Sequence, residues 1–212
     1  MNARAIFDRY FDECPLVAII RGVTPDEADA IGDALFEAGI RIVEVPMNSP
    51  DPLRSIKRLA ARLGERALVG AGTVLRPDDV QRVRDAGGRL VVSPNTNIAV
   101  IKATVAAGVV ASPGFFTPSE AFAALENGAH ALKLFPAEAA SPAVVKAMRA
   151  VLPKDVPLLI VGGVTPDTVG GWMAAGADGF GLGGALYQAG QTPAATLKKG
   201  RAFVAAVQRC AR

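Results

Sequence analysis

The sequence has few of the residues that build disulfide frameworks and metal centres. It holds two cysteines, Cys14 and Cys210, near opposite ends of 212 residues, and a single histidine, His130. Two cysteines in a chain of this length make no disulfide framework, and one histidine with two distant cysteines is no metal-ligand set. We therefore expect reduced thiols, no metal site and no histidine-containing catalytic triad.

Charge of one sign and long apolar runs are also scarce. The net charge is +3, and Lys and Arg are interleaved with Asp and Glu, which argues against a nucleic-acid partner. No stretch approaches the roughly 20 apolar residues that span a bilayer. The segment Met1–Tyr10 is charged and lacks the apolar region of a secretory signal. We expect a cytoplasmic protein without a membrane partner.

Short apolar runs rich in Val, Ile and Leu are plentiful. Turn residues and an amphipathic segment follow each run, which is typical of buried parallel strands that alternate with helices. The eight expected strands are Leu16–Ile20, Arg41–Val45, Ala67–Gly70, Leu90–Ser93, Val109–Ser112, Ala131–Phe135, Leu158–Val161 and Gly179–Leu182. Eight βα units in one domain, residues 1–212, predict a single (β/α)8 TIM barrel.

The segments between these runs carry the usual signals of helix ends. Pro near the first helical position predicts helix starts, for example at Thr24–Glu27, Ser49–Asp51 and Thr165–Asp167, and Gly marks the ends. We expect an extra helix over Ala3–Glu13 that covers the bottom of the barrel, and a closing helix over Ala194–Gln208. An open doubly wound sheet remains an alternative, although no Gly-x-Gly-x-x-Gly turn follows the first strand.

Lys133 is the most informative single residue. It stands in the middle of the expected strand Ala131–Phe135, between apolar neighbours. A buried unpaired charge is costly, so we expect a depressed pKa and a neutral amine that can attack a carbonyl and form an imine. A lysine that points outward, or one paired with Glu44 for structural reasons alone, remains the alternative.

Glu44 occupies an equivalent place in the second expected strand, and we expect Lys133 to be its partner. Burial raises the pKa of a carboxyl whereas a neighbouring amine lowers it, and a carboxyl balanced in this way suits a general acid/base. The alternative is a buried structural carboxylate. Because TIM-barrel active sites lie at the C-terminal ends of the strands, both residues are well placed for catalysis.

Two glycine-rich segments follow the seventh and eighth expected strands. Gly162 and Gly163 lie in the first, and Gly183 and Gly184 in the second. Barrels commonly bind phosphate between these two loops through bare backbone N–H groups, so we expect a phosphorylated substrate. Tight turns that only allow close helix packing are the alternative.

Other polar residues near strand ends are candidates for substrate binding. Arg21 is expected to reach the mouth and hold a carboxylate, hydroxyl or phosphate, or to tune Glu44. Thr73, Pro94 and Asn95 are expected to surround the end of the substrate that carries the carbonyl group, unless they are turn or cap residues. Further candidates are Asn48 after the second strand and Phe135, which follows the lysine closely enough to line the pocket.

Three aromatic or ring residues have other expected roles. His130 precedes the sixth strand at the end away from the site, and we interpret it as structural. Phe115 and Phe116 are candidates for an exposed subunit contact.

Six short motifs occur in a specific order between Glu44 and Val164, within a family resemblance that extends from Leu16 to Tyr187. They are Glu44-Val45-Pro46, Gly70-Ala71-Gly72-Thr73-Val74-Leu75, Ser93-Pro94-Asn95, Ser112-Pro113-Gly114, Leu132-Lys133-Leu134-Phe135-Pro136-Ala137-Glu138 and Val161-Gly162-Gly163-Val164. In this order they resemble the 2-keto-3-deoxy-6-phosphogluconate/6-phosphogalactonate aldolase family. The resemblance implies a homotrimeric (β/α)8 aldolase, without metal or organic cofactor, that cleaves a phosphorylated six-carbon 2-keto acid to pyruvate and glyceraldehyde 3-phosphate.

The same resemblance implies roles for the two strand residues: Lys133 forms the Schiff base, and Glu44 is the general acid/base. The galactonate branch is favoured by Val161 where the gluconate branch typically has Thr, by Asn48-Ser49 in place of Arg-Thr, and by Asn95 in place of Gly. Loss of the Thr hydroxyl removes a partner for a substrate hydroxyl. Gly184 stands where many relatives have Ser, so phosphate binding there must rely on backbone N–H groups.

Alternatives remain within and outside this class. The gluconate epimer, or both epimers, is the nearest alternative substrate. An isomerase or synthase on a phosphate-binding barrel shares the two glycine loops but needs no lysine in the sixth strand. A catalytically inactive barrel that serves as a binding module predicts ligand binding without turnover.

Overall fold

The apolar runs form short parallel strands in the computed structural model of this protein, which describes residues 2–210. The strands are β1 (Leu16–Ile19), β2 (Ile42–Pro46), β3 (Leu68–Gly72), β4 (Leu90–Val92), β5 (Val110–Ser112), β6 (Gly114–Phe115), β7 (Leu132–Leu134), β8 (Leu158–Val161) and β9 (Gly179–Leu182). The fifth predicted strand, Val109–Ser112, corresponds to β5. The chain continues past Pro113, which has no N–H to donate to the ladder, into the short strand β6, which was not predicted.

The strands close into a barrel. Their order is β5-β4-β3-β2-β1-β9-β8-β7-β6, and all pairings are parallel. Because β5 and β6 are consecutive in the chain, the two ends of this order meet. Bonds from Gly114 N–H to the Ser93 carbonyl (2.9 Å) and from His130 N–H to the Ala111 carbonyl (2.9 Å) complete the closure. The barrel prediction is confirmed, and the open sheet is excluded.

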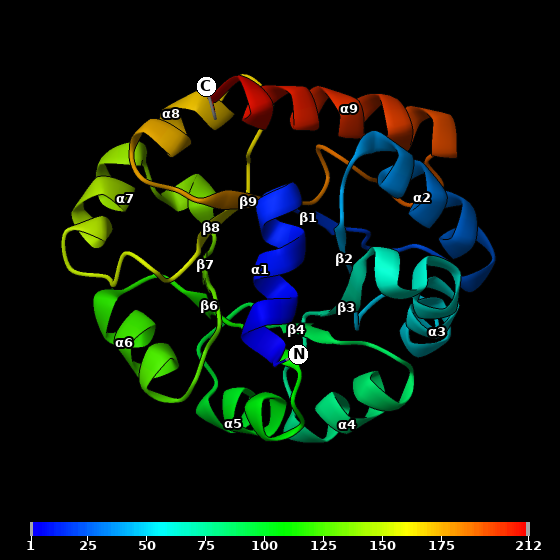
Figure 1. Ribbon diagram of the computed structural model, residues 1–212, viewed down its shortest axis with the longest axis horizontal. Helices are drawn as coiled ribbons and strands as arrows, with labels where there is room; N and C mark the ends of the chain where they lie inside the picture. The colour runs from blue at the N-terminus through cyan, green and yellow to red at the C-terminus, as the bar shows by residue number, and fades with distance from the viewer. Residues whose placement is uncertain (1, 211–212) are drawn as a thin grey trace.

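Helices surround the strands, as Figure 1 shows. They are α2 (Pro25–Ala38), α3 (Pro52–Leu63), α4 (Pro77–Asp85), α5 (Ile98–Ala106), α6 (Pro118–Glu126), α7 (Pro142–Arg149), α8 (Val169–Ala174) and α9 (Pro193–Cys210), with short 3-10 helices η1 (Gly64–Arg66) and η2 (Ala137–Ala139). The capping box of Thr24 and Glu27 starts α2, and Gly39 ends it with φ 102°. Two predicted starts were early: α3 begins at Pro52 and α8 at Val169.

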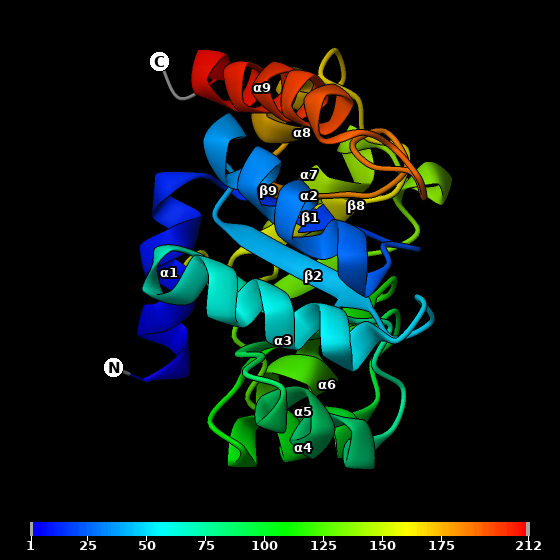
Figure 2. The same cartoon turned by 90° about the vertical axis from the view of Figure 1, so that its right-hand side faces the viewer.

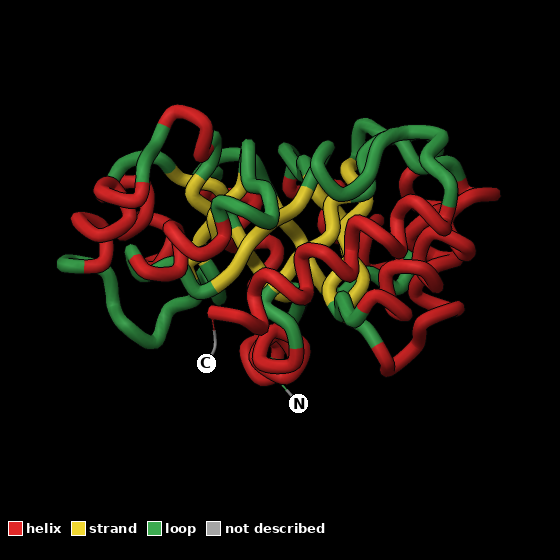
Figure 3. Tube along the Cα trace, turned by 90° about the horizontal axis from the view of Figure 1, so that it is seen from above, coloured by secondary structure: helices red, strands yellow, loops and turns green. Residues whose placement is uncertain are grey.

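The helix α1 (Ala3–Glu13) covers one end of the barrel, as predicted. It crosses that end in Figures 1 and 2, and in Figure 3 it lies opposite the end where most long loops gather. Phe7 is fully buried within the barrel, and the Tyr10 hydroxyl donates to the Glu65 carbonyl (2.7 Å). The N-terminal end of the barrel is therefore sealed, and the C-terminal end stays open.

The core has two parts, one on each side of the sheet. Side chains that alternate along each strand face either the helices or the barrel interior. The interior set, with Phe7 from α1, is Val17, Ile19, Ile42, Leu68, Leu90, Val92, Val110, Ala131, Leu159 and Val161. On β2 and β7 the same interior face continues into Glu44 and Lys133, two residues beyond Ile42 and Ala131.

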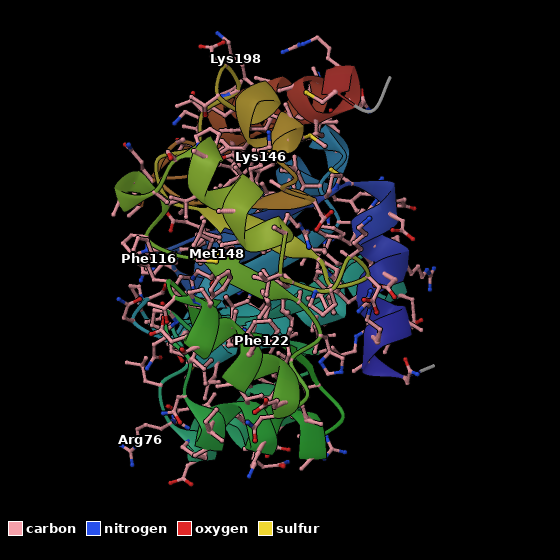
Figure 4. The ribbon with its side chains drawn as sticks, turned by 90° about the vertical axis from the view of Figure 1, so that its left-hand side faces the viewer. Arg76, Phe116, Phe122, Lys146, Met148 and Lys198 are labelled. Atoms are coloured by element: carbon pink, nitrogen blue, oxygen red, sulfur yellow. The ribbon has the colours of Figure 1, made fainter. Side chains whose placement is uncertain are left out.

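The exposed aromatic surface differs from the prediction. Phe115 is buried, with 2% exposure, so it belongs to the core and not to a subunit contact. Phe116 and Phe122 are exposed, and Figure 4 shows Phe116 toward the end opposite α1 and Phe122 on α6. The two differ from Phe115 because Phe116 follows the strand end and Phe122 lies on the outer side of the barrel.

Candidate active site

A cavity of about 710 Å³ opens at the C-terminal ends of the strands. Ten of the predicted site residues line it: Arg21, Thr73, Pro94, Lys133, Phe135, Val161, Gly162, Gly163, Gly183 and Gly184. Glu44, Asn48 and Asn95 are not among its lining residues. The barrel thus brings residues from six loops or strands, far apart in the chain, to one mouth.

Lys133 points into the barrel from the middle of β7. Its neighbours Leu132 and Leu134 face the helices, so the alternation of the strand turns Lys133 inward, and its exposure is 7%. Burial lowers the pKa of Lys133, nearby Glu44 opposes that shift, and Arg21 adds to it. The Nζ atom lies 4.7 Å from the ring centroid of Phe135. The outward-pointing alternative is therefore excluded, and the amine faces the cavity.

Glu44 lies deeper than Lys133. It is 2% exposed and lines a small inner cavity that also contacts Lys133 and Phe7. Burial raises the pKa of Glu44 to about 7, while Lys133 and Arg21 pull it down. The two groups interact through their charges, although they form no direct ion pair among the ion pairs of residues 2–210.

The position of Glu44 depends on a glycine in the neighbouring strand. A Cβ at Gly72 would collide with the Glu44 carboxylate, so only glycine leaves room for this side chain. Within the described residues, Glu44 Oε2 is buried and has no hydrogen-bond partner. An unsatisfied buried carboxyl oxygen beside a reactive amine is expected at a site that handles protons.

Arg21 is held at the mouth by two side chains from other loops. It donates to Asn48 Oδ1 and, at 3.4 Å, to Thr73 Oγ1. Thr73 has a positive φ of 55°, which is uncommon for a residue with a Cβ. Asn48 therefore contacts the guanidinium and not the cavity itself. The arrangement places a cation at the rim above Glu44 and Lys133.

The glycine loops after β8 and β9 both line the cavity. Gly162 and Gly163 have φ of 117° and 65°, which favours glycine. Gly183 and Gly184 are different, because a Cβ at either position would meet nothing within 4 Å. The open space at Gly184 means that the backbone does not require glycine there. The bare N–H groups of both loops can receive an anion.

Several residues that line this cavity had no predicted role. Glu138 in η2 lines it, together with Lys133 and both glycine loops. Glu138 ends the motif that contains Lys133, so the sequence could have drawn attention to it. Nothing in the local pattern, however, showed that its side chain lines the cavity. Thr165, Tyr187 and Gln188 also line the cavity.

Two predicted residues lie away from the cavity. Asn95 does not line the cavity, and its carbonyl accepts a hydrogen bond from Ser93 Oγ at 2.8 Å. His130 lies at the opposite end of the barrel, and its Nδ1 accepts from the Ala111 N–H at 3.0 Å. Burial, and then Arg4, lower the pKa of His130. The structural interpretation of His130 agrees with this geometry.

No group of three or more His, Cys, Asp or Glu in residues 2–210 is arranged to hold a metal ion. Cys14 is buried and Cys210 exposed, and both are free. Among the helices of the described residues, none is both long and apolar enough to cross a membrane.

Comparison with known proteins adds to this geometry. The aldolase family described as KDPG and KHG aldolase matches residues 7–199. The 2-dehydro-3-deoxy-6-phosphogalactonate aldolase of Escherichia coli is 47% identical over 91% of this chain and 94% of its own length. A native KDPGal structure superposes with a TM-score of 0.92 at 46% identity, covering 94% of this chain and 97% of that one.

A designed protein structure is also similar. It is a cube-shaped porous cage made by fusing symmetric oligomeric domains, and it superposes with a TM-score of 0.91 at 46% identity. The match covers 92% of this chain and 73% of that chain.

Proposed function

This chain belongs to the KDPG and KHG aldolase family, and we propose that it is a class I aldolase that cleaves 2-dehydro-3-deoxy-6-phosphogalactonate to pyruvate and glyceraldehyde 3-phosphate. The observation that carries the proposal is the buried amine of Lys133, which faces the cavity with a lowered pKa beside Glu44. A neutral amine attacks a ketone, whereas an ammonium does not.

The reaction begins when Lys133 Nζ attacks C2 of the keto acid. The carbonyl oxygen becomes the hydroxyl of a carbinolamine, and Glu44 donates the proton with which this hydroxyl leaves as water. An iminium ion that links C2 to Lys133 results. With a pKa of about 7, Glu44 can both give and take protons near neutral pH.

Carbon–carbon cleavage follows because the iminium accepts electrons. Glu44, through a water molecule, removes the proton of the C4 hydroxyl. The C3–C4 bond then breaks, C4 becomes the aldehyde of glyceraldehyde 3-phosphate, and the bonding electrons form an enamine at C2 and C3. Protonation of C3 by Glu44 and hydrolysis of the resulting imine release pyruvate and restore the amine.

The remaining cavity residues bind the two ends of the substrate. Arg21, Thr73 and Pro94, which line the cavity, surround the keto-acid carboxylate. The backbone N–H groups of the two glycine loops hold the phosphate, as helix and loop amides do in many barrels. Phe135 packs beside the lysine and excludes water from the imine.

Val161 supports the galactonate substrate over its gluconate epimer. It lines the cavity and has no hydroxyl to offer to the sugar hydroxyl whose configuration differs. The gluconate epimer, or both epimers, remains the alternative. A missing hydrogen-bond partner of this kind shifts selectivity by about 1 kcal/mol or more.

We propose further that the enzyme is a cytoplasmic homotrimer. The resemblance of the motifs supports the trimer, and the similar cage was built from symmetric oligomeric domains. Exposed Phe116 is a candidate for the subunit contact. A monomer in light scattering at assay concentration would contradict this assignment.

The test measures pyruvate release, coupled to lactate dehydrogenase, from both epimers in parallel. We expect turnover and borohydride trapping of pyruvate in the wild type, and neither in Lys133→Ala. Lys146→Ala is the matched control, because Lys146 is exposed on α7 (Figure 4). The ratio of the two rates identifies the substrate. Phosphosugar isomerisation without a pyruvate adduct would instead favour the isomerase class, and trapping that survives Lys133→Ala would refute the Schiff-base assignment.

A further inference from the structure

The proposed mechanism leaves one acidic residue of the cavity without a role. Glu138 lies in η2, five residues after Lys133, and lines the cavity with Lys133 and both glycine loops. A carboxylate beside a phosphate site repels the anion, so its presence there needs a different explanation.

The side chain of Glu138 packs directly on the loop after β8. A Cβ at Gly162 would collide with the Glu138 carboxylate, and a Cβ at Gly163 would lie 2.9 Å from Glu138 Cγ. Both glycines also have positive φ, so a larger residue there is unfavourable for two reasons. The Glu138 carboxylate therefore lies directly against the proposed phosphate loop.

The oxygen atoms of Glu138 are free to accept hydrogen bonds. Neither the hydrogen bonds nor the ion pairs formed between described residues involve this carboxylate. A carboxylate offers about four lone-pair positions, and an exposed one normally gives them to water. Here the carboxylate faces the cavity that the substrate is proposed to fill.

This inference rests on the proposed function, in which the substrate extends from Lys133, bonded to C2, to the glycine loops, which bind the phosphate on C6. The hydroxyls on C4 and C5 lie between these two points. Because Glu138 touches the loop that holds the phosphate, the hydroxyl nearest to it is that of C5, the carbon next to the phosphate-bearing carbon. We propose that Glu138 is a substrate-binding residue that accepts a hydrogen bond from the C5 hydroxyl.

This contact selects aldehydes that carry a hydroxyl next to the phosphorylated carbon. A hydrogen bond from a hydroxyl to a charged acceptor contributes roughly tenfold to a hundredfold in kcat/KM when its partner is removed. Glu44 does not line the large cavity, so the contact with C5 does not duplicate its role in proton transfer.

The test runs the reaction in the direction of condensation, with pyruvate and one of two aldehydes. The first is glyceraldehyde 3-phosphate, and the second is 3-phosphonooxypropanal, which lacks the hydroxyl that becomes the C5 hydroxyl. We expect the wild type to prefer the hydroxylated aldehyde. Glu138→Ala is expected to lower kcat/KM for that aldehyde by about tenfold or more and to change the value for the other by less than about twofold. Glu138→Gln keeps an acceptor oxygen without charge, and its kcat/KM for the hydroxylated aldehyde is expected to lie between those of the wild type and Glu138→Ala.

Two controls separate this contact from a role in the fold or in imine chemistry. Glu126→Ala removes an exposed acid at the end of α6, outside the cavity, and is expected to change neither value. Deuterium exchange at C3 of pyruvate requires Lys133 and Glu44 but no aldehyde, so we expect it to be unchanged in Glu138→Ala.

The outcomes are distinct. An equal loss on both aldehydes would overturn the proposal, because it would mean that Glu138 only supports the loop. Tighter inhibition by inorganic phosphate with an unchanged aldehyde preference would also overturn it, as would a wild type that does not distinguish the aldehydes. Failure of the wild type to exchange pyruvate protons would instead refute the proposed function.

Discussion

At the N-terminal end of the barrel, the inward side chains are Val17 in β1, Ile42 in β2 and Ala131 just before β7. Two residues further along the same strands they are Ile19, Glu44 and Lys133. The first layer, here called the lower layer, is apolar and sealed by α1. The second, the upper layer, contains two ionisable groups beneath an open cavity.

The difference between the layers has an energetic reason. The lower layer stabilises the fold by removing apolar surface from water. The upper layer buries groups whose charged forms lose hydration, and the result is visible in the raised pKa of Glu44 and the lowered pKa of Lys133. On the same strands, residues that stabilise the fold and residues that are proposed to react are therefore only two positions apart.

The substitution with the largest expected effect replaces an ionisable side chain of the upper layer with an apolar one. Lys133→Met fills the same space with an apolar side chain, and we expect kcat to fall by roughly 10³-fold or more because no imine can form. The free energy of unfolding is expected to stay equal or to rise, since a buried amine is removed. Chemical denaturation and the pyruvate assay measure the two effects. A marked loss of stability would show that Lys133 contributes to the fold.

Glu44→Gln tests the proton-transfer half of the upper layer. We expect kcat to fall by roughly 10²- to 10⁴-fold, the usual contribution of a general acid/base. In the wild type, kcat/KM is expected to titrate near pH 7, following the pKa of Glu44, and this inflection disappears in the variant. Borohydride trapping of pyruvate at long incubation tests whether the lysine remains reactive. An unchanged pH profile would exclude Glu44 as the titrating group.

The same residue links pH to stability. The carboxyl has a pKa of about 7 in the folded state, above its ordinary value of 4.5, so the folded state binds the proton more tightly. Its favourable contribution is complete below pH 4.5 and is lost as the pH rises toward 7. We expect Glu44→Gln to flatten the stability curve in this window. The lowered pKa of Lys133 acts in the opposite direction, because the folded state then binds fewer protons and stability rises with pH through its own window.

Phe7 lies between the two layers, so its replacement is expected to affect both stability and the pKa of Glu44. It is fully buried in α1 and lines the small cavity beneath Glu44 and Lys133. We expect Phe7→Ala to lower the free energy of unfolding by about 3–5 kcal/mol. Water that enters the gap is expected to shift the pKa of Glu44 down from about 7, which the pH profile of kcat/KM detects.

Phe11→Ala is the control for this variant. Phe11 stacks on Phe7, with ring centroids 4.9 Å apart, but does not line the inner cavity. Phe11→Ala is expected to destabilise the protein without shifting the pH profile of kcat/KM. A shift of equal size in both variants would show that general loosening, and not the floor of the cavity, sets the pKa.

The smallest expected effect concerns Asn48, which holds Arg21 at the rim. Asn48→Ala is expected to raise the KM for pyruvate in the exchange assay by about tenfold, and to have little effect once Arg21 is replaced by Ala. Asn48→Asp keeps an acceptor oxygen and is expected to restore most of the affinity. Additive losses in the double variant would mean that Asn48 acts independently of Arg21.

Local sequence patterns predicted much of this architecture. Apolar runs and glycine punctuation indicated the βα repeat, and a charged residue in an apolar strand singled out Glu44 and Lys133. The same patterns placed the start of α3 two residues early, because Pro50 is as good a helix-start signal as Pro52. They also grouped Phe115 with exposed Phe116, although the alternation of the strand buries the first.

What the sequence determined by itself is therefore local: which segments are strands, which residues carry reactive groups, and which turns need glycine. Only the closed barrel decided which of those groups meet. The contact of Glu44 with Gly72, the bond from Arg21 to Asn48 and the packing of Glu138 on Gly162 each join separate βα units. Such contacts depend on the register and closure of all the strands together, and no local periodicity contains that information.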